Sequence, residues 1–542
     1  MKRKSMLLLA LVLIVTAMPL AGFAETQRDK LVITATIEGN ADAHDSMVEE
    51  AFQELMSEKL NREIEIQYTM IPSSDYATKT QLLLAVGDLT DFFQLPFLYD
   101  YTKPMEEGYF LELSQYRDQL DNYFNYIEQT SGGLASVMTA EGEVYIIAGI
   151  GLPRFPADRG MLPNNLTMYR ADIFDKHGIP YPTTIDEMYE AAKQLKELYP
   201  DVYPINTRWN DLRSLFAANH TRNTVYWNGE EYVQGLFEEG YKEAIAFAQK
   251  LYVEGLLDPE YIIETDDTLK SKEMTDRTFI VMADWFTTPG EFTRLSETGQ
   301  IFAAALMPDN PKYGTCWQSV DRVNEISRNG FYSAVIRSDV EDVEGLLEFL
   351  NTCYEEDVVE LLNWGIEGVT YTVDADGNKA FVDEIMSAVD PWTAADAYGM
   401  RASRNKRPGL NLVDDSTAFV GLASDDWLIY DGEVHQEPIE KSPFYTSIPY
   451  PENEYMPPYF DEPQLQFTVE ESQQISLITT AVDTCRDEWQ ASFVNGSLSM
   501  DQWDDYMNAL NDAAEAGGGM DVLLEIYNAA AQRYLDNQSA SE

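Results

Sequence analysis

Hydrophobic and polar positions alternate, or recur at helical spacing, over the first hundred residues. The run LVITATI at 31–37 is β-branched and of strand length, and EIEIQYTMI at 63–71 alternates apolar with polar side chains. The elements expected in order are a strand at 31–37, a helix at 45–60, a strand at 63–71, a helix at 75–88 and a strand at 91–97. Gly87 ends the second helix, in the position that a left-handed C-cap prefers. Strands that alternate with helices predict a parallel sheet in an α/β fold.

A second region of this kind begins near Leu166. In PTTIDEMYEAAKQLKELYP, Thr184 and Glu187 form a capping box at the start of a helix that Pro200 ends. RTFIVMADW at 277–285 predicts a strand with a polar and aromatic end. Because ligands collect at the carboxyl ends of strands in parallel α/β sheets, we expect this end to face a ligand.

Amphipathic helices dominate the C-terminal part of the chain. Ser499 and Gln502 form another capping box before WDDYMNALNDAAEA, and the glycines at 517–519 predict a break after this helix. Between about 399 and 463, Gly, Pro, Asp and Tyr are frequent and periodicity is weak, which indicates loops with short strands. The chain shows no internal repeat.

The first 24 residues have the pattern of a secretory signal. A basic start, KRK, precedes the apolar run MLLLALVLIV, which is shorter than the roughly 18 residues of a membrane-spanning helix. Phe23 stands where a lipoprotein would carry its lipidated cysteine, so we expect no lipid anchor. Cleavage after Ala24 would give a mature chain that starts at Glu25. An uncleaved signal that acts as an anchor is the alternative.

The chain is strongly acidic, with a formal net charge of −56. Loss of residues 1–24 removes three positive and no negative charges, which would give −59. Such a field repels phosphate backbones and anionic membranes, so we expect no nucleic-acid partner. A hydrophobic fraction of 45% and an aromatic fraction of 12% nevertheless predict a folded chain, and 542 residues exceed a single core.

Cysteines and histidines are few and scattered. They are Cys316, Cys353, Cys485, His44, His177, His220 and His435. This spacing matches no disulfide framework and no metal-binding motif, although one cysteine pair could still bridge. We expect no cofactor and no metal site.

Five segments resemble, in order, conserved blocks of the family 1 extracellular solute-binding proteins, the sugar-capturing receptors of ATP-driven importers. The segments are GDLTDFFQLP, LTMYRADIFDKHGIPYPTTIDEMYEAAKQLKELYP, AIAFAQKLYVEGLLDPEY, LLNWGIEGVTYTVDADGN and FVNGSLSMDQWDDYMNAL. They cover most of the chain from about Leu31 to Leu535. Two features differ from relatives: Phe23 replaces the lipobox cysteine, and YPDVYPINTRW stands where some relatives carry a calcium loop.

The resemblance implies a two-lobed, periplasmic-binding-protein-like fold of type II, with a hinge and a cleft between the lobes. We expect residues 25–158 and 325–385 in lobe one, and 159–324 and 386–542 in lobe two. A ligand in the cleft would favour the closed form, which the membrane permease of an ABC importer would recognise. We expect a monomer.

A sugar ring presents C–H faces to aromatic rings and hydroxyl groups to polar side chains, so both residue types are needed together. Trp209 follows a predicted strand and has Arg208 and Asp211 as polar neighbours, and Trp285 ends the strand at 277–285. The predicted ligand-binding residues are Asn40, Asp42, Gln94, Trp209, Asn210, Asp284, Trp285, Trp364, Glu367 and Tyr371.

Each of these residues also has a structural explanation. A tryptophan is more often a packing residue than a ligand platform, and this applies most to Trp364. Glu367 could accept backbone N–H groups in a tight turn. Arg154 and Arg159 could pair with surface carboxylates instead of contacting sugar.

These observations favour a non-catalytic receptor that captures a carbohydrate, with an oligosaccharide expected, and delivers it to an ABC importer permease. We expect it outside the cytoplasm, extracellular or associated with the cell envelope. Reading the chain shows no nucleophile elbow, HExxH, P-loop or dinucleotide motif. The alternatives are a secreted glycan hydrolase, which needs two placed carboxylates, and a soluble sugar scavenger or sensor without a permease.

Overall fold

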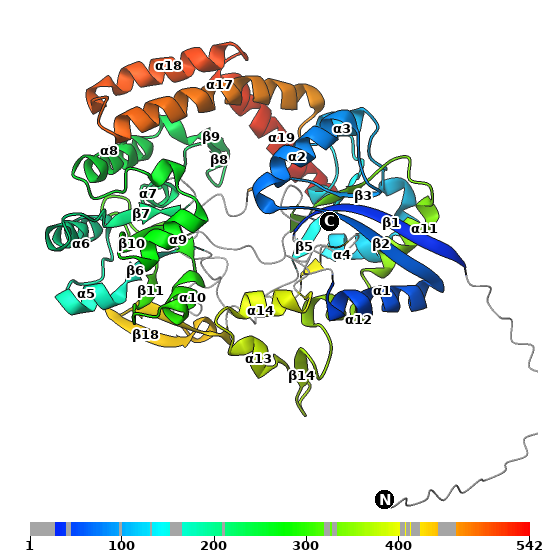
Figure 1. Cartoon of the computed structure of the whole chain (residues 1–542). Coiled ribbons are helices and arrows are strands. Elements are labelled where there is room, and N and C mark those ends of the chain that lie inside the picture. Colours follow the sequence, from blue (N-terminus) through cyan, green and yellow to red (C-terminus); the bar gives the residue numbers. More distant parts are fainter. Residues whose placement is uncertain are drawn as a thin grey trace, which may run out of the picture.

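The computed structural model describes most of the chain. The described residues are 28–39, 45–96, 100–129, 133–151, 165–208, 212–318, 326–327, 333–400, 407, 412–413, 423–442 and 462–541. They form two lobes, each built on its own sheet, with a pair of long C-terminal helices along one side of the molecule (Figure 1). The predicted α/β, two-lobed fold is confirmed.

The first lobe is built on a five-stranded sheet of order β2-β1-β3-β13-β4. The strands are β1 (Arg28–Glu38), β2 (Arg62–Ile71), β3 (Phe92–Gln94), β4 (Ile146–Ile147) and β13 (Ala334–Ile336). β1 pairs with β2 and β3 in parallel, as predicted, whereas β13 runs antiparallel to β3 and β4. The complete sheet is therefore mixed, because its last two strands come from chain reversals that local sequence does not encode.

Helices cover this sheet. They are α1 (Met47–Leu60), α2 (Ser73–Val86), α3 (Thr102–Glu106), α4 (Asp121–Gln129), α11 (Val343–Thr352), α12 (Glu356–Trp364), α13 (Asp383–Met386) and α14 (Pro391–Ala397), with the hairpin β14 (Tyr371–Val373) and β15 (Lys379–Phe381). In α1, Ser46 caps the N-terminus and Val48, Phe52 and Met56 are buried at four-residue spacing. Gly87 ends α2 with φ +68°, and a Cβ there would lie 2.9 Å from the Tyr109 ring. Glycine is thus required for both conformation and space.

The second lobe is built on a six-stranded sheet of order β18-β17-β11-β6-β10-β7. The strands are β6 (Asn165–Arg170), β7 (Ile205–Thr207), β10 (Ile280–Trp285), β11 (Phe302–Ala305), β17 (Asp425–Tyr430) and β18 (Glu433–Pro438). β10 pairs with β7 in parallel but with β6 antiparallel. The carboxyl ends of β7 and β10 and the start of β6 therefore meet at one edge.

The helices of the second lobe lie on both faces of its sheet. They are α5 (Ala171–His177), α6 (Ile185–Leu198), α7 (Arg213–Ala218), α8 (Glu239–Val253), α9 (Asp266–Met274) and α10 (Thr288–Leu295), with the hairpin β8 (Val225–Trp227) and β9 (Tyr232–Gln234). Thr184 accepts the Glu187 N–H at the start of α6, as predicted, but the Glu187 carboxylate accepts from the Thr183 N–H. Within the described residues, no helix is both long enough and apolar enough to cross a membrane.

A small third sheet lies where the chain passes between the lobes. Its order is β12-β5-β16, with β5 at Gly149–Gly151, β12 at Ile326–Ser327 and β16 at Leu412–Val413. β5 lies between β4 and β6, β12 between β11 and β13, and β16 between α14 and β17. Each strand therefore belongs to a different passage, so the chain crosses between the lobes at least three times. The exact lobe boundaries given above stay predictions.

The C-terminal helices contact both lobes. They are α17 (Val469–Val494), α18 (Trp503–Glu515) and α19 (Met520–Ser541). Ile478, Val482 and Phe493 of α17 belong to the second lobe's core. Gln466, just before α17, donates from its amide to the carbonyl of Ala135 in the first lobe. Ala135 belongs to the short 3₁₀ turn Gly133–Ser136, which α19 also contacts. The helices thus join the lobes on the side opposite α13 and α14 (Figure 1).

The break predicted at 517–519 separates α18 from α19. Gly518 and Gly519 have φ of +102° and +101°, and a Cβ on Gly517 would lie 2.4 Å from an Ile478 side-chain atom. Glycine is needed because the turn passes close against α17. The Ser499–Gln502 capping box is also confirmed, although it opens a short 3₁₀ turn before α18.

Candidate functional site

Four side chains come together at the edge where β6 starts and β7 and β10 end. Arg208 directly follows β7, and Asp284 and Trp285 end β10. Asn165, the first residue of β6, pairs with Trp285 across the antiparallel ladder. The predicted rim of polar and aromatic residues is therefore formed by three neighbouring strands.

A β-bulge shapes the end of β10. The pairing with β6 shifts register between Val281 and Asp284, and the buried residue Ala283 has φ +56°. A left-handed conformation costs a non-glycine residue of order 1 kcal/mol and is retained where surrounding structure imposes it. After the bulge, Asp284 is 1% exposed and Trp285 is 41% exposed. The bulge thus buries a carboxylate and presents an indole beside it.

The Asp284 carboxylate is held through one of its two oxygens. Arg208 Nη1 pairs with Oδ1, the Thr288 hydroxyl donates to it at 3.0 Å, and the Trp285 backbone N–H donates at 2.7 Å. Arg208 Nε also contacts Asp266 at 3.2 Å. Burial raises the pKa of Asp284, against the opposing charge of Arg208. The Arg208 charge is already balanced within the protein.

Two buried polar atoms at this edge have no hydrogen-bond partner in the part of the chain that the structure describes. Among the described residues, neither Asp284 Oδ2 nor Asn165 Nδ2 makes a hydrogen bond, and Asn165 is 4% exposed. Such groups are rare in native structures because each costs about 1–3 kcal/mol of desolvation. One is an acceptor and the other a donor, and Trp285 lies next to both in the ladder. This is the combination that a hydroxyl-rich ring can satisfy.

Glu273 is a second buried carboxyl in this region. It is 2% exposed, and burial, followed by the charge of Asp284, raises its pKa well above the usual value. Glu273 and Asp284 both interact with the single guanidinium of Arg208. The Arg208 charge is therefore shared among acidic groups of the protein itself.

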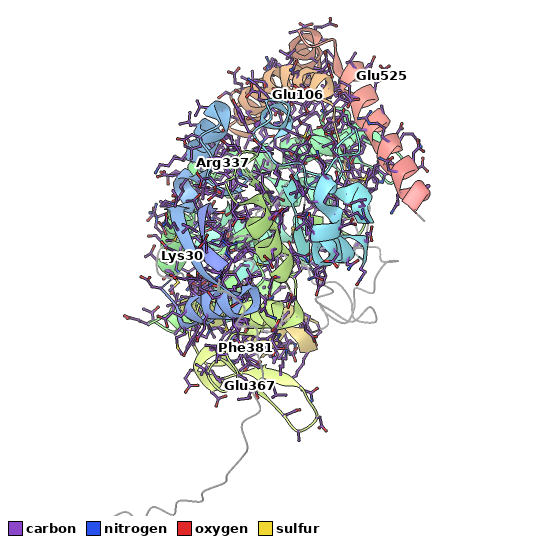
Figure 2. The ribbon with its side chains drawn as sticks, turned by 90° about the vertical axis from the view of Figure 1, so that its right-hand side faces the viewer. Lys30, Glu106, Arg337, Glu367, Phe381 and Glu525 are labelled. Carbon is purple, nitrogen blue, oxygen red and sulfur yellow. The ribbon has the colours of Figure 1, made fainter. Side chains whose placement is uncertain are left out.

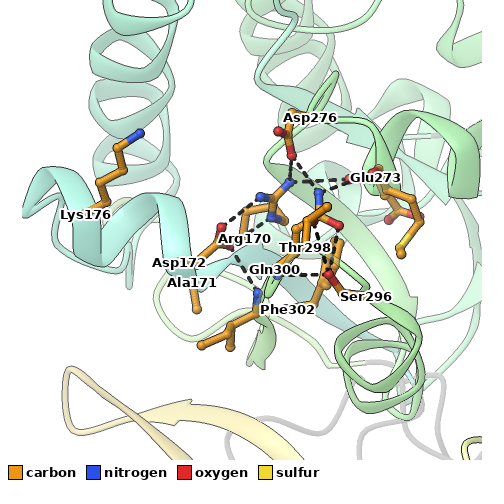
Figure 3. A network of polar contacts seen from close by, with 12 residues as sticks. Arg170, Ala171, Asp172, Lys176, Glu273, Asp276, Ser296, Thr298, Gln300 and Phe302 are labelled. Carbon is orange, nitrogen blue, oxygen red and sulfur yellow. Dashed lines mark hydrogen bonds and ion pairs between the residues drawn. The ribbon is translucent and has the colours of Figure 1, made fainter.

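The opposite end of β6 is fixed by a polar network (Figure 3). Arg170 pairs with both oxygens of Asp172 at 2.9 Å and also with Asp276. Gln300 donates to Asp276 at 2.7 Å. These bonds hold the far end of the strand, whereas the Asn165 end has an unused donor. The two ends of β6 thus differ, because the polar groups of Arg170 are paired whereas Asn165 Nδ2 makes no hydrogen bond within the described residues.

Gln94 lies in the first lobe, at the end of β3. Its side chain is 2% exposed, and its Oε1 accepts the Glu38 N–H at 2.9 Å, at the end of β1. This bond holds the chain just before Asn40. Four predicted ligand residues lie outside the described residues: Asn40, Asp42, Trp209 and Asn210. Their roles stay predictions.

The three predicted residues around the WGIEGVTY segment are not brought to the β10 edge. Trp364 is 5% exposed and stacks on Phe381, with ring centroids 4.7 Å apart. Tyr371 is buried in the same core, and its hydroxyl donates to the Glu360 carboxylate. Glu367 is exposed near the β14–β15 hairpin, at one end of the molecule (Figure 2). The burial of both rings favours packing, which is the alternative given above for Trp364.

Asn165 is not among the residues predicted from the sequence. Those predictions rest on the carboxyl ends of parallel strands, and Asn165 starts a strand that runs antiparallel to β10. The signal in the sequence is a polar residue at the start of NLTMYR, but the antiparallel pairing that brings it to this edge forms with residues far along the chain.

Comparisons with known proteins show similarity to extracellular solute-binding proteins over part of the chain. The family model described as "Bacterial extracellular solute-binding protein" matches residues 44–274. Lipoprotein LipO of Bacillus subtilis (strain 168) is 27% identical over 216 residues, which are 37% of this chain and 40% of that protein. The chain thus matches less than half of the length of this relative.

Solved structures share the fold over nearly the whole chain. The alginate-binding protein AlgQ2, solved without calcium ion, has a TM-score of 0.69 at 18% identity and covers 94% of this chain and 99% of its own. The S. pneumoniae substrate-binding protein FusA, in complex with kestose, has a TM-score of 0.68 at 17% identity, with coverages of 94% and 100%. The predicted resemblance to the extracellular solute-binding proteins is confirmed over residues 44–274 by the family match. The solved structures show that the two-lobed fold is shared over 94% of the chain.

Proposed function

We propose that this protein captures an uncharged carbohydrate, of oligosaccharide length, outside the cytoplasm and delivers it to the permease of an ABC importer. The observation that carries this proposal is the edge of the second lobe, where Trp285 is partly exposed, its ladder partner Asn165 and its chain neighbour Asp284 are buried, and Asn165 Nδ2 and Asp284 Oδ2 make no hydrogen bond within the described residues. The ring would stack on C–H faces, and the two polar atoms would pair with hydroxyls.

The electrostatics support a neutral ligand. Arg208 is paired with Asp284 and Asp266, and Glu273 adds a further buried carboxyl nearby. Because the Arg208 charge is already paired with these carboxylates, it would not be available to neutralise an anionic sugar at this edge. Proteins of the same fold include one named as alginate-binding and one solved with kestose, so the fold accommodates carbohydrates of different charge.

The two-lobed arrangement supports capture by closure. The predicted first-lobe residues Asn40 and Asp42 follow β1, whose end the Gln94 side chain holds. Closure would bring them against the second lobe's edge and complete the ligand contacts. The permease would then distinguish the loaded, closed protein from the empty one. Export through the signal at residues 1–24, without lipid attachment at Phe23, is part of the same proposal.

The test is a glycan screen on the chain from Glu25 onward. A ligand that binds only the native state raises its stability, by about 2.7 kcal/mol at a hundredfold excess over Kd, so melting temperature detects binding. We expect an upward shift with at least one neutral oligosaccharide, a more compact scattering profile in its presence, and recovery of the sugar intact. Shortened products would indicate the hydrolase, and an unchanged profile with bound sugar would argue against closure.

A further inference from the structure

A second group of aromatic side chains lies on the flank of the same sheet edge. Trp317 stacks on His220 with ring centroids 4.6 Å apart and planes 10° from parallel. The Tyr226 ring lies edge-on to the Trp317 indole, with ring centroids 6.2 Å apart and planes at 63°. Trp317 and His220 are both only partly buried. The pair therefore forms a flat aromatic surface outside the residues assigned to the site above.

The position of this surface relative to Trp285 follows from the packing. Trp317 packs against a small buried cluster that contains Ala217, Ala218, Ala283 and Cys316. Ala283 is the bulge residue of β10, two positions before Trp285. Trp317 thus packs, through Ala283, against the same end of β10 that carries Trp285.

The aromatic surface is held rigidly. The fully buried amide of Gln318 accepts the Met307 N–H at 3.0 Å and donates to the Met307 and Cys316 carbonyls at 3.2 and 3.3 Å. His220 Nε2 is 2.7 Å from the Thr315 carbonyl, and the His220 backbone has φ +51°. A non-glycine residue in this conformation is uncommon and is often found at ligand sites.

Ser214 provides an independent sign of a ligand. It is 5% exposed, and its hydroxyl makes no hydrogen bond within the described residues. Ser214, Ala217 and Ala218 occupy positions i, i+3 and i+4 of α7, so they lie on one face of that helix. That face packs against Ala283 and Trp317. Within the described residues, an unbonded hydroxyl therefore lies one helical turn before the two alanines that pack in the cluster with Trp317.

We propose that Trp317, supported by His220, is a second sugar-stacking subsite, with Ser214 as a hydroxyl partner, so that the ligand spans at least two sugar units along this edge. This inference rests on the proposed carbohydrate function and adds a minimum ligand length to it. A single ring would occupy the Trp285 position. A longer chain would gain the Trp317 contact and satisfy the Ser214 hydroxyl.

The test uses ladders of one to six units of neutral homo-oligosaccharides, namely α-1,4-glucan, β-1,4-glucan, β-1,4-mannan and β-2,1-fructan, with Kd measured by calorimetry on the full-length mature chain. We expect affinity to rise between one unit and three. Trp317→Ala should weaken oligomers about tenfold and leave the single unit unchanged, whereas Trp285→Ala should weaken both.

Ser214→Ala separates binding from folding. Loss of an unbonded buried hydroxyl should leave the melting temperature unchanged or raise it, while the Kd for the trimer rises several-fold. His220→Ala provides a second variant if Trp317→Ala does not fold. Equal affinity for one and three units, or trimer binding unchanged in both Ser214→Ala and Trp317→Ala, would overturn the subsite but not the receptor function. Failure of every ladder and of the wider glycan screen would overturn both.

Discussion

Arg208 and Asp284 form an ion pair between the ends of two neighbouring parallel strands, with exposed fractions of only 9% and 1%. Loss of one partner leaves a buried charge uncompensated. We expect Asp284→Asn to lower the free energy of unfolding by about 3 kcal/mol, as measured by urea denaturation.

Asp266 provides the matched control for this pair. It contacts the same guanidinium, but its side chain is 72% exposed. Asp266→Asn should therefore cost less than about 1 kcal/mol. If Asp266→Asn and Asp284→Asn lowered the free energy of unfolding by similar amounts, burial would not determine the strength of the Arg208 contacts.

Trp285 should affect binding much more than folding. The residue is 41% exposed, whereas the core tryptophan Trp364 is 5% exposed, so Trp285→Ala removes less buried surface than loss of a core tryptophan would. Loss of a stacking surface should raise the Kd of the bound glycan about tenfold, equivalent to about 1.4 kcal/mol. Trp427→Ala, in β17 of the same sheet but toward its other edge, is the control and should leave the Kd unchanged. Equal Kd values for wild type and Trp285→Ala would exclude Trp285 as a contact.

Asn165 should also act through the ligand. Because its Nδ2 has no partner among the described residues, Asn165→Ala should change the free energy of unfolding by less than about 1 kcal/mol. The Kd should rise about tenfold if that donor binds a hydroxyl. Asn363 is the control, since its buried amide donates to the Val359 carbonyl at 2.9 Å. Asn363→Ala should lower stability and leave affinity unaltered, which is the reverse pattern.

Local sequence predicted the elements whose causes are local. The Thr184 cap, the left-handed Gly87 and the Ser499–Gln502 box involve neighbours within a few residues, and all three are present. Strand pairing is different, because β13 pairs with β3 from a distant part of the chain. A pattern of apolar residues predicts a strand but not its partner or direction.

The candidate site shows the same limit. Asp284 and Trp285 could be predicted because they end a strand whose carboxyl edge faces ligands in this class of fold. Asn165 could be predicted only by knowing that β6 runs antiparallel to β10, which brings its first residue beside Trp285. Trp364 was predicted as a ligand residue from the resemblance of its segment to a family block, yet it stacks on Phe381 of the β14–β15 hairpin. Burial of that kind arises from tertiary contacts, and composition around the residue does not reveal it.

Asp426 should give the second lobe a pH-dependent stability. The residue is 2% exposed, and burial raises its pKa from the usual 3.8 to about 8. Between these values the native state binds a proton that the unfolded chain has lost, so this contribution to stability is complete below about pH 4. It decreases as the pH rises toward 8, by up to about 1.4 kcal/mol per pH unit.

Comparison with Asp426→Asn isolates this contribution from those of the other acids. Urea denaturation of both proteins at several pH values between 5 and 8 should show the wild type losing stability relative to the variant as pH increases. Gly290 approaches so closely that a Cβ there would lie 2.6 Å from Asp426 Oδ1, so the carboxyl has little room to relax toward water. A stability difference that stays constant, or that shifts in favour of the wild type with rising pH, would contradict the prediction.

Arg407 and Glu49 form the most buried ion pair described in the first lobe. Their side chains are 1% and 3% exposed, and Arg407 Nε lies 2.6 Å from Glu49 Oε2. Arg407 Nη2 also donates to the Gly399 carbonyl at 3.0 Å, which ties the chain beyond α14 to α1. Arg407→Met should cost about 3–5 kcal/mol, because it leaves the Glu49 charge buried without its partner.

A double-mutant cycle distinguishes loss of the pair from loss of packing. Glu49→Gln in the Arg407→Met background removes the uncompensated charge, so the double variant should recover part of the lost free energy of unfolding. Lys59→Met is the surface control: Lys59 joins α1 to Glu355 at 2.8 Å, but the Glu355 side chain is 44% exposed, so the cost should stay below about 1 kcal/mol. If the two single losses simply added in the double variant, the buried charge would not be the source of the destabilisation, and the Arg407 contribution would have to come from its contacts with Gly399 and the Phe52 ring.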